Sequence, residues 1–260
     1  QPRGKQIKNP HGIWYTPVTG IWQTVWIESV PKTYIVNTKQ TPKFDIGKLT
    51  FEANVEGSQN GDQIKVAVLD GNRQIKAQIV DANTTVDIHV PNLEAWSPSN
   101  PKLYDLDIHL IRNGKVIDKT KSYFAMRKIS MEKDKNGIQR MMLNNKFVFQ
   151  YGPLDQGWWP DGLHTAPSDE ALKFDVIKTK EMGFNMIRKH IKVEPARWYR
   201  HCDSIGMLVW QDMPSGDLGG NSWDMQPGKI SGDLRDKNRS AESEGYFRKE
   251  WKTIMETLHN

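Results

Sequence analysis

The pattern of apolar residues changes near Lys128, and this change limits the folds that the chain can adopt. From about Tyr34 to Phe124, short alternating runs are separated by turn signals that contain Gly and Asn, which predicts antiparallel strands. After Lys128, apolar runs alternate with helical patterns, which predicts a parallel sheet with right-handed crossovers. We therefore expect a multidomain protein in which an all-β part precedes an α/β part.

The all-β part contains alternating runs at 34–38, 48–57, 63–71, 84–90, 103–111 and 115–124. Strands at this spacing, over a segment of about 90 residues, are typical of an immunoglobulin-like β-sandwich. No pattern of catalytic residues appears among these runs. The sequence therefore predicts that residues 34–126 form a structural sandwich domain.

Residues 1–33 begin with an irregular stretch punctuated by Pro and Gly and continue with IWQTVWIESV at 21–30. The aromatic and β-branched residues of that run predict a strand. A segment of this length is too short to bury a core of its own. We expect it to be the last strand and tail of a domain whose earlier part is missing.

The α/β part, residues 127–260, shows apolar strand patterns at 147–152, 184–191 and 207–213. Ser168 is expected to cap a helix that stops at Gly183, and Pro195 lies in the first turn of a helix that ends near Gly206. A Gly- and Asp-rich loop is expected at 215–239 and a last helix at 243–258. A closed (β/α)₈ barrel needs about 250 residues, so about three βα units form a smaller open sheet or a truncated barrel.

The composition argues against several classes of protein. The net charge is +5, but the 36 Lys and Arg residues are spread along the chain among 31 acids, without the basic stripe of a nucleic-acid-binding protein. The mean hydropathy is −0.68, and no apolar run approaches the ~18–20 residues of a membrane helix. The first residues lack the apolar core of a signal peptide. We expect neither a nucleic-acid nor a membrane partner.

No cofactor or metal site is expected either. The sequence has no Gly-rich phosphate loop and no cluster of His, Cys and Asp at metal-binding spacing. The single cysteine, Cys202, excludes an intrachain disulfide and is expected to be a small core residue on a helix. Ten Trp residues are the less usual feature, because indoles supply both core bulk and flat platforms for sugar rings.

Several segments resemble glycoside hydrolase family 2, in the order found in that family. GIWYTPVTGIWQTVWIESV (12–30) resembles the end of its sugar-binding jelly-roll domain, and LEAWSPSNPKLYDLDIHL (93–110) resembles its immunoglobulin-like domain. FAMRKISM (124–131) is similar to the following junction, with Ala125-Met126 replacing the usual small pair. The segments at 144–162 and 183–215 resemble the opening strands of its TIM barrel. The resemblance implies a jelly-roll remnant at 1–33, an immunoglobulin-like sandwich at 34–126 and a partial barrel at 127–260.

By this resemblance the parent protein is a retaining, β-galactosidase-like exo-glycosidase that acts on terminal β-glycosidic bonds of glycosides or oligosaccharides. Retaining enzymes use two carboxyl groups about 5–5.5 Å apart. In this family both are glutamates, and the acid/base glutamate follows an asparagine. The sequence contains no Asn-Glu pair, so we expect both glutamates to be absent and the chain by itself to be inactive. Many relatives are secreted or periplasmic, which the resemblance implies for the parent.

Barrel enzymes carry their sites at the carboxyl ends of the strands, so the candidate pocket residues are those at or just after the end of each predicted strand. They are Asp155, Trp158, Trp159, Arg188, His190 and Asp212. Arg188 matches the family arginine that hydrogen-bonds the nucleophilic glutamate, whereas His190 falls one position before the histidine of the R-x-S-H pattern in many relatives. An independent acid/base pair of Asp212 with Asp155 or Glu194 is disfavoured, because nothing sets the required separation.

Two alternatives stay open at this stage. In the first, the chain is a non-catalytic carbohydrate-binding or spacer module, with Trp158 and Trp159 either stacking on sugar or anchoring their loop as buried indoles. In the second, the open three-stranded sheet leaves an unpaired edge and an apolar face, through which the chain self-associates.

Overall fold

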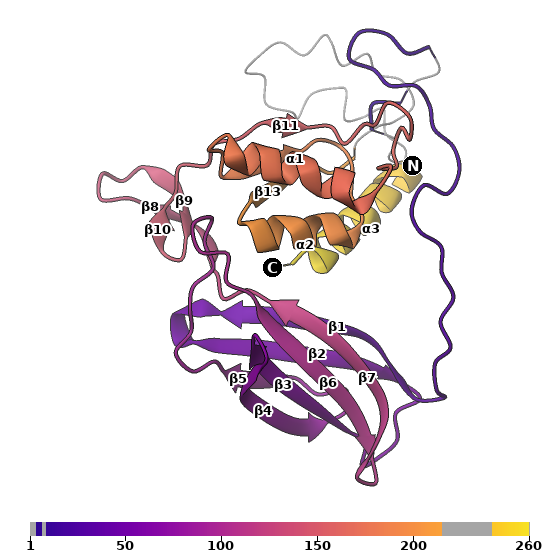
Figure 1. Cartoon of the computed structure of the whole chain (residues 1–260), viewed down its shortest axis with the longest axis vertical. Helices are drawn as coiled ribbons and strands as arrows, with labels where there is room; N and C mark the ends of the chain where they lie inside the picture. Colours follow the sequence, from indigo (N-terminus) through magenta and orange to yellow (C-terminus); the bar gives the residue numbers. More distant parts are fainter. Residues whose placement is uncertain (1–3, 7–8, 215–240, 260) are drawn as a thin grey trace. The chain divides into compact units, whose positions relative to one another are not determined.

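The computed structural model describes residues 4–6, 9–214 and 241–259, and Figure 1 shows the order of its elements. The chain is mostly β-sheet with few helices. It divides into two compact units. Unit 1 contains Gln1–Thr24, Gly152–Tyr199 and Val209–Leu258, and unit 2 contains Val25–Tyr151, Arg200–Leu208 and His259–Asn260. The predicted loop at 215–239 lies outside the described residues. In the described part, no helix combines the length and apolar character needed to cross a membrane.

Unit 2 is built on two antiparallel sheets made of seven strands. One sheet has the order β1-β2-β5, with strands Tyr34–Lys43, Lys48–Glu56 and Val86–His89, and a short 3₁₀ helix, Phe44–Ile46, joins the first two. The other has the order β4-β3-β6-β7, with strands Arg73–Asp81, Gln63–Asp70, Tyr104–Arg112 and Lys115–Phe124. Each of the six alternating runs expected at 34–124 overlaps one of these strands.

The seventh strand, β4, was not predicted. It forms a hairpin with β3 through the turn at Gly71, whose φ of 58° lies in the left-handed region that favours glycine. The sequence predicts the turn but not the strand that follows it. The reason is that RQIKAQIVD forms an edge strand and contains many polar and charged residues. No side chain of β4 is fully buried, so its alternation of apolar and polar residues is weak.

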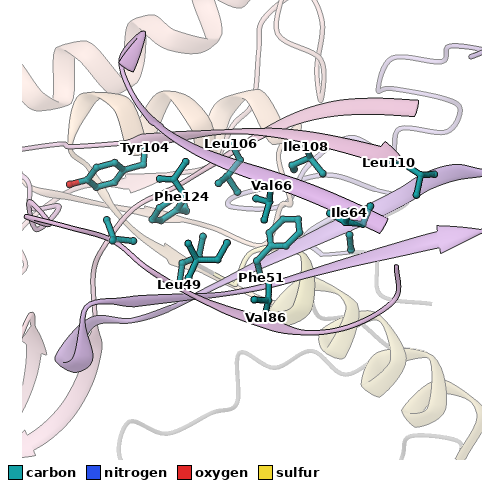
Figure 2. Packing of buried hydrophobic residues seen from close by; sticks show 14 of the residues in the cluster. Leu49, Phe51, Ile64, Val66, Val86, Tyr104, Leu106, Ile108, Leu110 and Phe124 are labelled. Carbon is teal, nitrogen blue, oxygen red and sulfur yellow. The ribbon is translucent and has the colours of Figure 1, made fainter. Parts of the chain in front are cut away.

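Alternate side chains of the two sheets point inward and form one hydrophobic core. Along β6, Tyr104, Leu106, Ile108 and Leu110 are buried while their neighbours are not, which is the period of two that a half-buried strand requires. Figure 2 shows these residues packed against Phe51 and the facing strand residues. The core is therefore made by the inner faces of both sheets, as in other β-sandwiches.

A buried ion pair closes one end of this sandwich. The Arg112 side chain donates two hydrogen bonds of 2.7 Å to the Asp62 carboxylate, and the backbone amide of Gln59 donates a third of 2.8 Å. Hydrogen bonds from Arg112, and then from Gln59, lower the pKa of Asp62 to about 2. Asp62 itself is only 2% exposed.

The Asp62 carboxylate is expected to make unit 2 sensitive to acid. Because the folded-state pKa of about 2 lies below the ordinary value of 3.8, the stabilisation is complete above 3.8 and is lost as the pH falls towards 2. We expect Asp62→Asn to lower the free energy of unfolding at neutral pH and to flatten its pH dependence across that window. Urea denaturation between pH 2 and 5 measures both. If the free energy of unfolding of the variant fell with decreasing pH as steeply as that of the unchanged chain, the role given to Asp62 would be contradicted.

The second half of helix α2 (Ala196–Ile205) also belongs to unit 2. Asp203 receives hydrogen bonds from Arg127 (2.8 Å) and from the Tyr123 hydroxyl (3.0 Å), and its backbone oxygen accepts from Trp96 Nε1 (2.8 Å). The Arg127 guanidinium also lies 4.6 Å from the Trp96 ring centroid. These contacts anchor the carboxyl end of α2. They also account for the complete burial of the Trp96 side chain.

Two predicted strands differ from the structure. The run at 21–30 forms no strand, and Ile27 is 97% exposed. A strand requires a neighbour for its backbone groups, and no strand in the described ranges pairs with this run. The run at 147–152 contributes only Phe147, which ends β10 (Lys146–Phe147). This strand pairs antiparallel with β9 (Gln139–Leu143), next to β8 (Ile129–Lys133).

Unit 1 carries a three-stranded sheet with the order β11-β12-β13, in which β12 (Met186–Lys189) pairs parallel with β11 (Leu154–Asp155). The third strand, β13, spans Leu208–Gln211. Both strand patterns predicted at 184–191 and 207–213 are thus confirmed, whereas the first parallel strand begins after 147–152 rather than within it. The apolar character of 147–152 marks a connection instead of a parallel strand.

Helices α1 and α2 end where the glycine signals predicted, whereas α2 begins at Ala196, so Pro195 precedes the helix and does not lie in its first turn. Helix α1 spans Asp169–Glu181, and Ser168 Oγ accepts a hydrogen bond of 3.1 Å from the backbone amide of Ala171. Gly183 and Gly206 follow α1 and α2 with φ of 89° and 85°, the left-handed conformation that ends a helix. Helix α3 spans Ala241–Thr257, close to the predicted range of 243–258.

Candidate functional site

The parallel ladder brings the ends of three strands together. The backbone amides of Arg188 and His190 donate to the carbonyl oxygens of Pro153 (3.0 Å) and Asp155 (2.8 Å). The amide of Asp212 donates to the carbonyl oxygen of Lys189 at 3.0 Å. The residues that follow each strand therefore lie at one edge of the sheet, where α/β proteins place their ligand sites.

Three of the candidate residues contact one another at this edge. Arg188 donates from Nε and Nη2 to the two oxygens of Asp212, each at 3.0 Å, and His190 Nδ1 lies 2.8 Å from Asp212 Oδ2. Burial acts to raise the pKa of Asp212, but the hydrogen bonds from Arg188 and His190 outweigh it and hold that pKa below its ordinary value. The hydrogen bond to Asp212 raises the pKa of Arg188. Asp212 therefore orients a cation and an imidazole at the same time.

A fourth candidate, Asp155, belongs to a buried cluster of charges. Lys189 Nζ donates to Asp155 Oδ2 at 2.7 Å and to Glu194 Oε1 at 2.9 Å, and Lys192 Nζ lies 2.9 Å from the same Glu194 oxygen. Lys192 also donates to the carbonyl oxygens of Gly157 (2.6 Å) and His164 (2.8 Å). Burial lowers the pKa of Lys192, against the opposing effect of Glu194. This cluster ties the loop after β11 to the loop after β12.

Sequence reasoning missed the two lysines of this cluster. Lys189 is only 1% exposed and occupies an inward position of β12, beside the exposed Arg188. A lysine at an inward strand position must be paired with a carboxylate. The position of Lys189 within an apolar run was therefore the sequence signal that could have predicted this cluster. Of the partners of Lys189, Asp155 is one of the predicted pocket residues, whereas Glu194 was considered only as a disfavoured acid/base partner of Asp212.

Of the remaining candidates, Trp158 and Trp159, the first lies in an aromatic cluster with the N-terminal segment. The Trp158 ring centroid lies 4.7 Å from that of Tyr15 and 5.0 Å from that of His164. Trp159 exchanges backbone hydrogen bonds of 2.8 and 3.0 Å with Leu163. Local sequence patterns carried no signal that Tyr15 contacts this loop.

Several buried polar atoms of this region have no hydrogen-bond partner within the part of the chain that the structure describes. They are Tyr15 Oη, Trp159 Nε1, His164 Nδ1 and His190 Nε2. Tyr15, His164 and His190 also line one small cavity of about 10 Å³, together with Gln6 and Lys192. Buried polar atoms without partners mark places where water or a ligand group binds. Across residues 4–6, 9–214 and 241–259, no group of three or more His, Cys, Asp and Glu side chains is arranged to hold a metal ion.

Comparisons with known proteins agree on one family. The family model of glycosyl hydrolases family 2 matches residues 33–127. A protein of Formosa agariphila, provisionally named a β-glucuronidase, is 29% identical over 78% of this chain and 26% of its own length. The β-galactosidase of Lactococcus lactis is 26% identical over 75% of this chain and 19% of its own length. The chain thus spans about a quarter or less of these relatives.

Solved structures support the same fold. The β-glucuronidase of Bifidobacterium dentium, solved with coumarin-3-O-glucuronide, superposes with a TM-score of 0.64 at 18% identity, over 71% of this chain and 31% of that one. Similarity at this identity concerns the fold alone. The matched family model and the curated relatives show that the chain is similar to members of glycosyl hydrolase family 2.

Proposed function

We propose that this chain is a non-catalytic portion of a retaining exo-glycosidase that hydrolyses terminal β-glycosidic bonds, as β-galactosidases do. In this proposal residues 1–33 are the end of a jelly-roll domain, residues 34–126 an immunoglobulin-like sandwich, and residues 127–260 the first part of a (β/α)₈ barrel. The observation that carries the proposal is the contact of Arg188, His190 and Asp212 at the carboxyl ends of adjacent strands, in a chain whose relatives are named as glycosidases.

The chain's residues prepare a site rather than carry out the bond cleavage. Arg188 is held as a cation by Asp212, and a cation at this edge favours the ionised form of a nearby carboxylate nucleophile. Asp212 also fixes the orientation of His190 through Nδ1. His190 Nε2, a buried atom without a partner among the described residues, lies at the small cavity of about 10 Å³, which has room for about one water molecule.

Three carboxylates at the strand ends of the described part, Asp155, Glu194 and Asp212, are unsuited to replace the two glutamates. Asp155 and Glu194 both accept hydrogen bonds from Lys189, and Asp212 accepts them from Arg188. A retaining mechanism needs one carboxyl group free to attack and a second that holds a proton. All three carboxylates are instead used by cations of the same unit, which supports an inactive chain.

This proposal predicts the outcome of a hydrolysis assay with aryl β-galactosides, β-glucuronides, β-mannosides and β-glucosides. The purified chain should show no turnover of any of them, whereas a longer form with the remaining barrel strands should hydrolyse at least one. Turnover by the chain that survives repurification and disappears in Asp212→Asn or Asp155→Asn would overturn the proposal. It would mean that these carboxylates form a complete site.

The contacts of Trp158 bear on the alternative of a carbohydrate-binding or spacer module. Because its ring packs against Tyr15 and His164, the indole serves as an anchor of the loop, which weighs against an open stacking platform at this position. Self-association through the edge of the β11-β12-β13 sheet stays a prediction.

A further inference from the structure

A second, larger cavity of unit 1 is separate from the six candidate residues. Its volume is about 290 Å³, and Trp22, His164, Thr165, Leu172, Glu194 and Arg197 contribute to its lining. The volume lies near the lower end of the range for ligand pockets, about 300–1,000 Å³. Its walls come from the N-terminal segment, from the loops that follow β11 and β12, and from the first turns of α1 and α2. It therefore opens at the strand ends where parallel sheets bind ligands.

The lining combines one flat apolar surface with hydrogen-bonding groups. Trp22 is held in place by Thr165 Oγ1, which donates to the Trp22 carbonyl oxygen at 2.8 Å, and by the Lys192 ammonium, 5.2 Å from its ring centroid. Gln23 and Thr24 add an amide and a hydroxyl to the wall. An indole beside amide and hydroxyl groups matches a sugar ring, which has apolar C–H faces and a rim of hydroxyls.

His164 is a neutral side chain of the wall, and the position of its proton follows from its neighbours. The Gln6 amide oxygen accepts a hydrogen bond from the backbone amide of Val18 at 2.6 Å, so its nitrogen faces His164 Nε2 at 3.2 Å. An amide nitrogen only donates, and Nε2 must therefore accept. Burial, and then the nearby Lys192, lower the pKa of His164 and favour its neutral form. The proton lies on Nδ1, a buried atom for which the described residues offer no acceptor.

The charges around this cavity are balanced. Glu194 is paired with Lys189 and Lys192, each 2.9 Å from its Oε1. Arg197, the one Lys or Arg side chain among the described lining residues, pairs with Asp169 at 3.1 Å. A ligand carboxylate would find no unengaged cation in this part of the wall. The balance therefore favours a neutral sugar over a uronate.

We propose that this cavity is a subsite for one neutral pyranose unit, which stacks on Trp22 and forms hydrogen bonds with the polar groups of Gln23 and Thr24. The subsite is distinct from Arg188, His190 and Asp212, so it binds a sugar unit other than one held by those residues. The proposal rests on the proposed action of the parent protein on glycosides. It assigns to the present chain a binding property that needs none of the absent catalytic glutamates.

Saturation-transfer NMR on the purified chain tests this subsite, with methyl β-D-galactopyranoside, methyl β-D-glucopyranoside and D-glucuronate as probes. At least one neutral glycoside should bind saturably and more tightly than glucuronate. Trp22→Ala should weaken that binding about tenfold or more, because lost stacking and apolar contact exceed about 1.4 kcal/mol. The matched control is Trp26→Ala, since Trp26 is 71% exposed, lines neither cavity and pairs with Glu28. It should bind like the unchanged chain.

A second variant keeps the test decisive if Trp22→Ala fails to fold. Ala166 also lines the cavity, and Ala166→Trp should fill it and abolish binding while the Trp22 contacts remain. Three results would overturn the subsite: no saturable binding of either neutral glycoside, equal binding by the unchanged chain and the folded variants, or preferential binding of glucuronate. Hydrolysis by a longer form of the protein does not enter this measurement, so the subsite and the proposed function fail independently.

Discussion

Replacing Lys189 with methionine is expected to lower the free energy of unfolding of unit 1 by about 3–5 kcal/mol. The Lys189 ammonium lies 2.7 Å from Asp155 and 2.9 Å from Glu194, and it also sits 4.2 Å from the ring centroid of Trp198. Lys189 and Glu194 side chains are 1% and 2% exposed. Removal of the ammonium leaves the partly buried Asp155 without its cation and the buried Glu194 with Lys192 alone.

Hydrogen exchange followed by mass spectrometry measures this loss, because peptides from α1 and β12 report the opening of unit 1. The matched control is Lys178→Met. Lys178 is 46% exposed and pairs with Glu181 on the surface of α1, so its loss should change stability by less than about 1 kcal/mol. Adding Asp155→Asn and Glu194→Gln to the Lys189 variant should restore part of the stability. A loss below about 1 kcal/mol in Lys189→Met would show that the cluster is hydrated.

Phe51→Ala is expected to destabilise unit 2 by about 3–5 kcal/mol. Phe51 is 1% exposed and lies in the core between the two sheets (Figure 2). Truncation removes the apolar contacts of the ring and leaves a cavity, because strands on both sides hold the surrounding side chains in place. The matched control is Val116→Ala on β7. Val116 is 52% exposed, and its truncation should cost no more than about 0.5 kcal/mol.

The single cysteine offers a probe that is specific to unit 2. Cys202 is 1% exposed and lies on the half of α2 that belongs to this unit. Its reaction with a thiol reagent in increasing urea therefore reports the opening of unit 2, and Phe51→Ala should shift the midpoint to lower urea while Val116→Ala leaves it unchanged. Equal midpoints for the two variants would show that the core between the sheets relaxes around the missing ring.

Local patterns were sufficient for most elements of the fold. Alternation with a period of two identified six strands of the sandwich, and Ser168, Gly183 and Gly206 marked helix ends, because these signals act over a few residues. The same local signals failed where pairing decides the outcome. The run at 21–30 has strand residues but no strand beside it, while β4 has weak alternation and is a strand because β3 supplies its hydrogen bonds.

Some features of the candidate site were likewise predictable from local sequence, and others arise only from the tertiary structure. Arg188, His190 and Asp212 were predictable as residues at the ends of strands, since parallel register brings such positions to one edge. Only the tertiary structure joined Gln6 and Trp22 to the loop at 164–165, across 158 and 143 residues of chain. It also placed Lys189 between two buried carboxylates. Hydrophobic period and capping are set by neighbouring residues, whereas these contacts depend on which distant segments fold against each other.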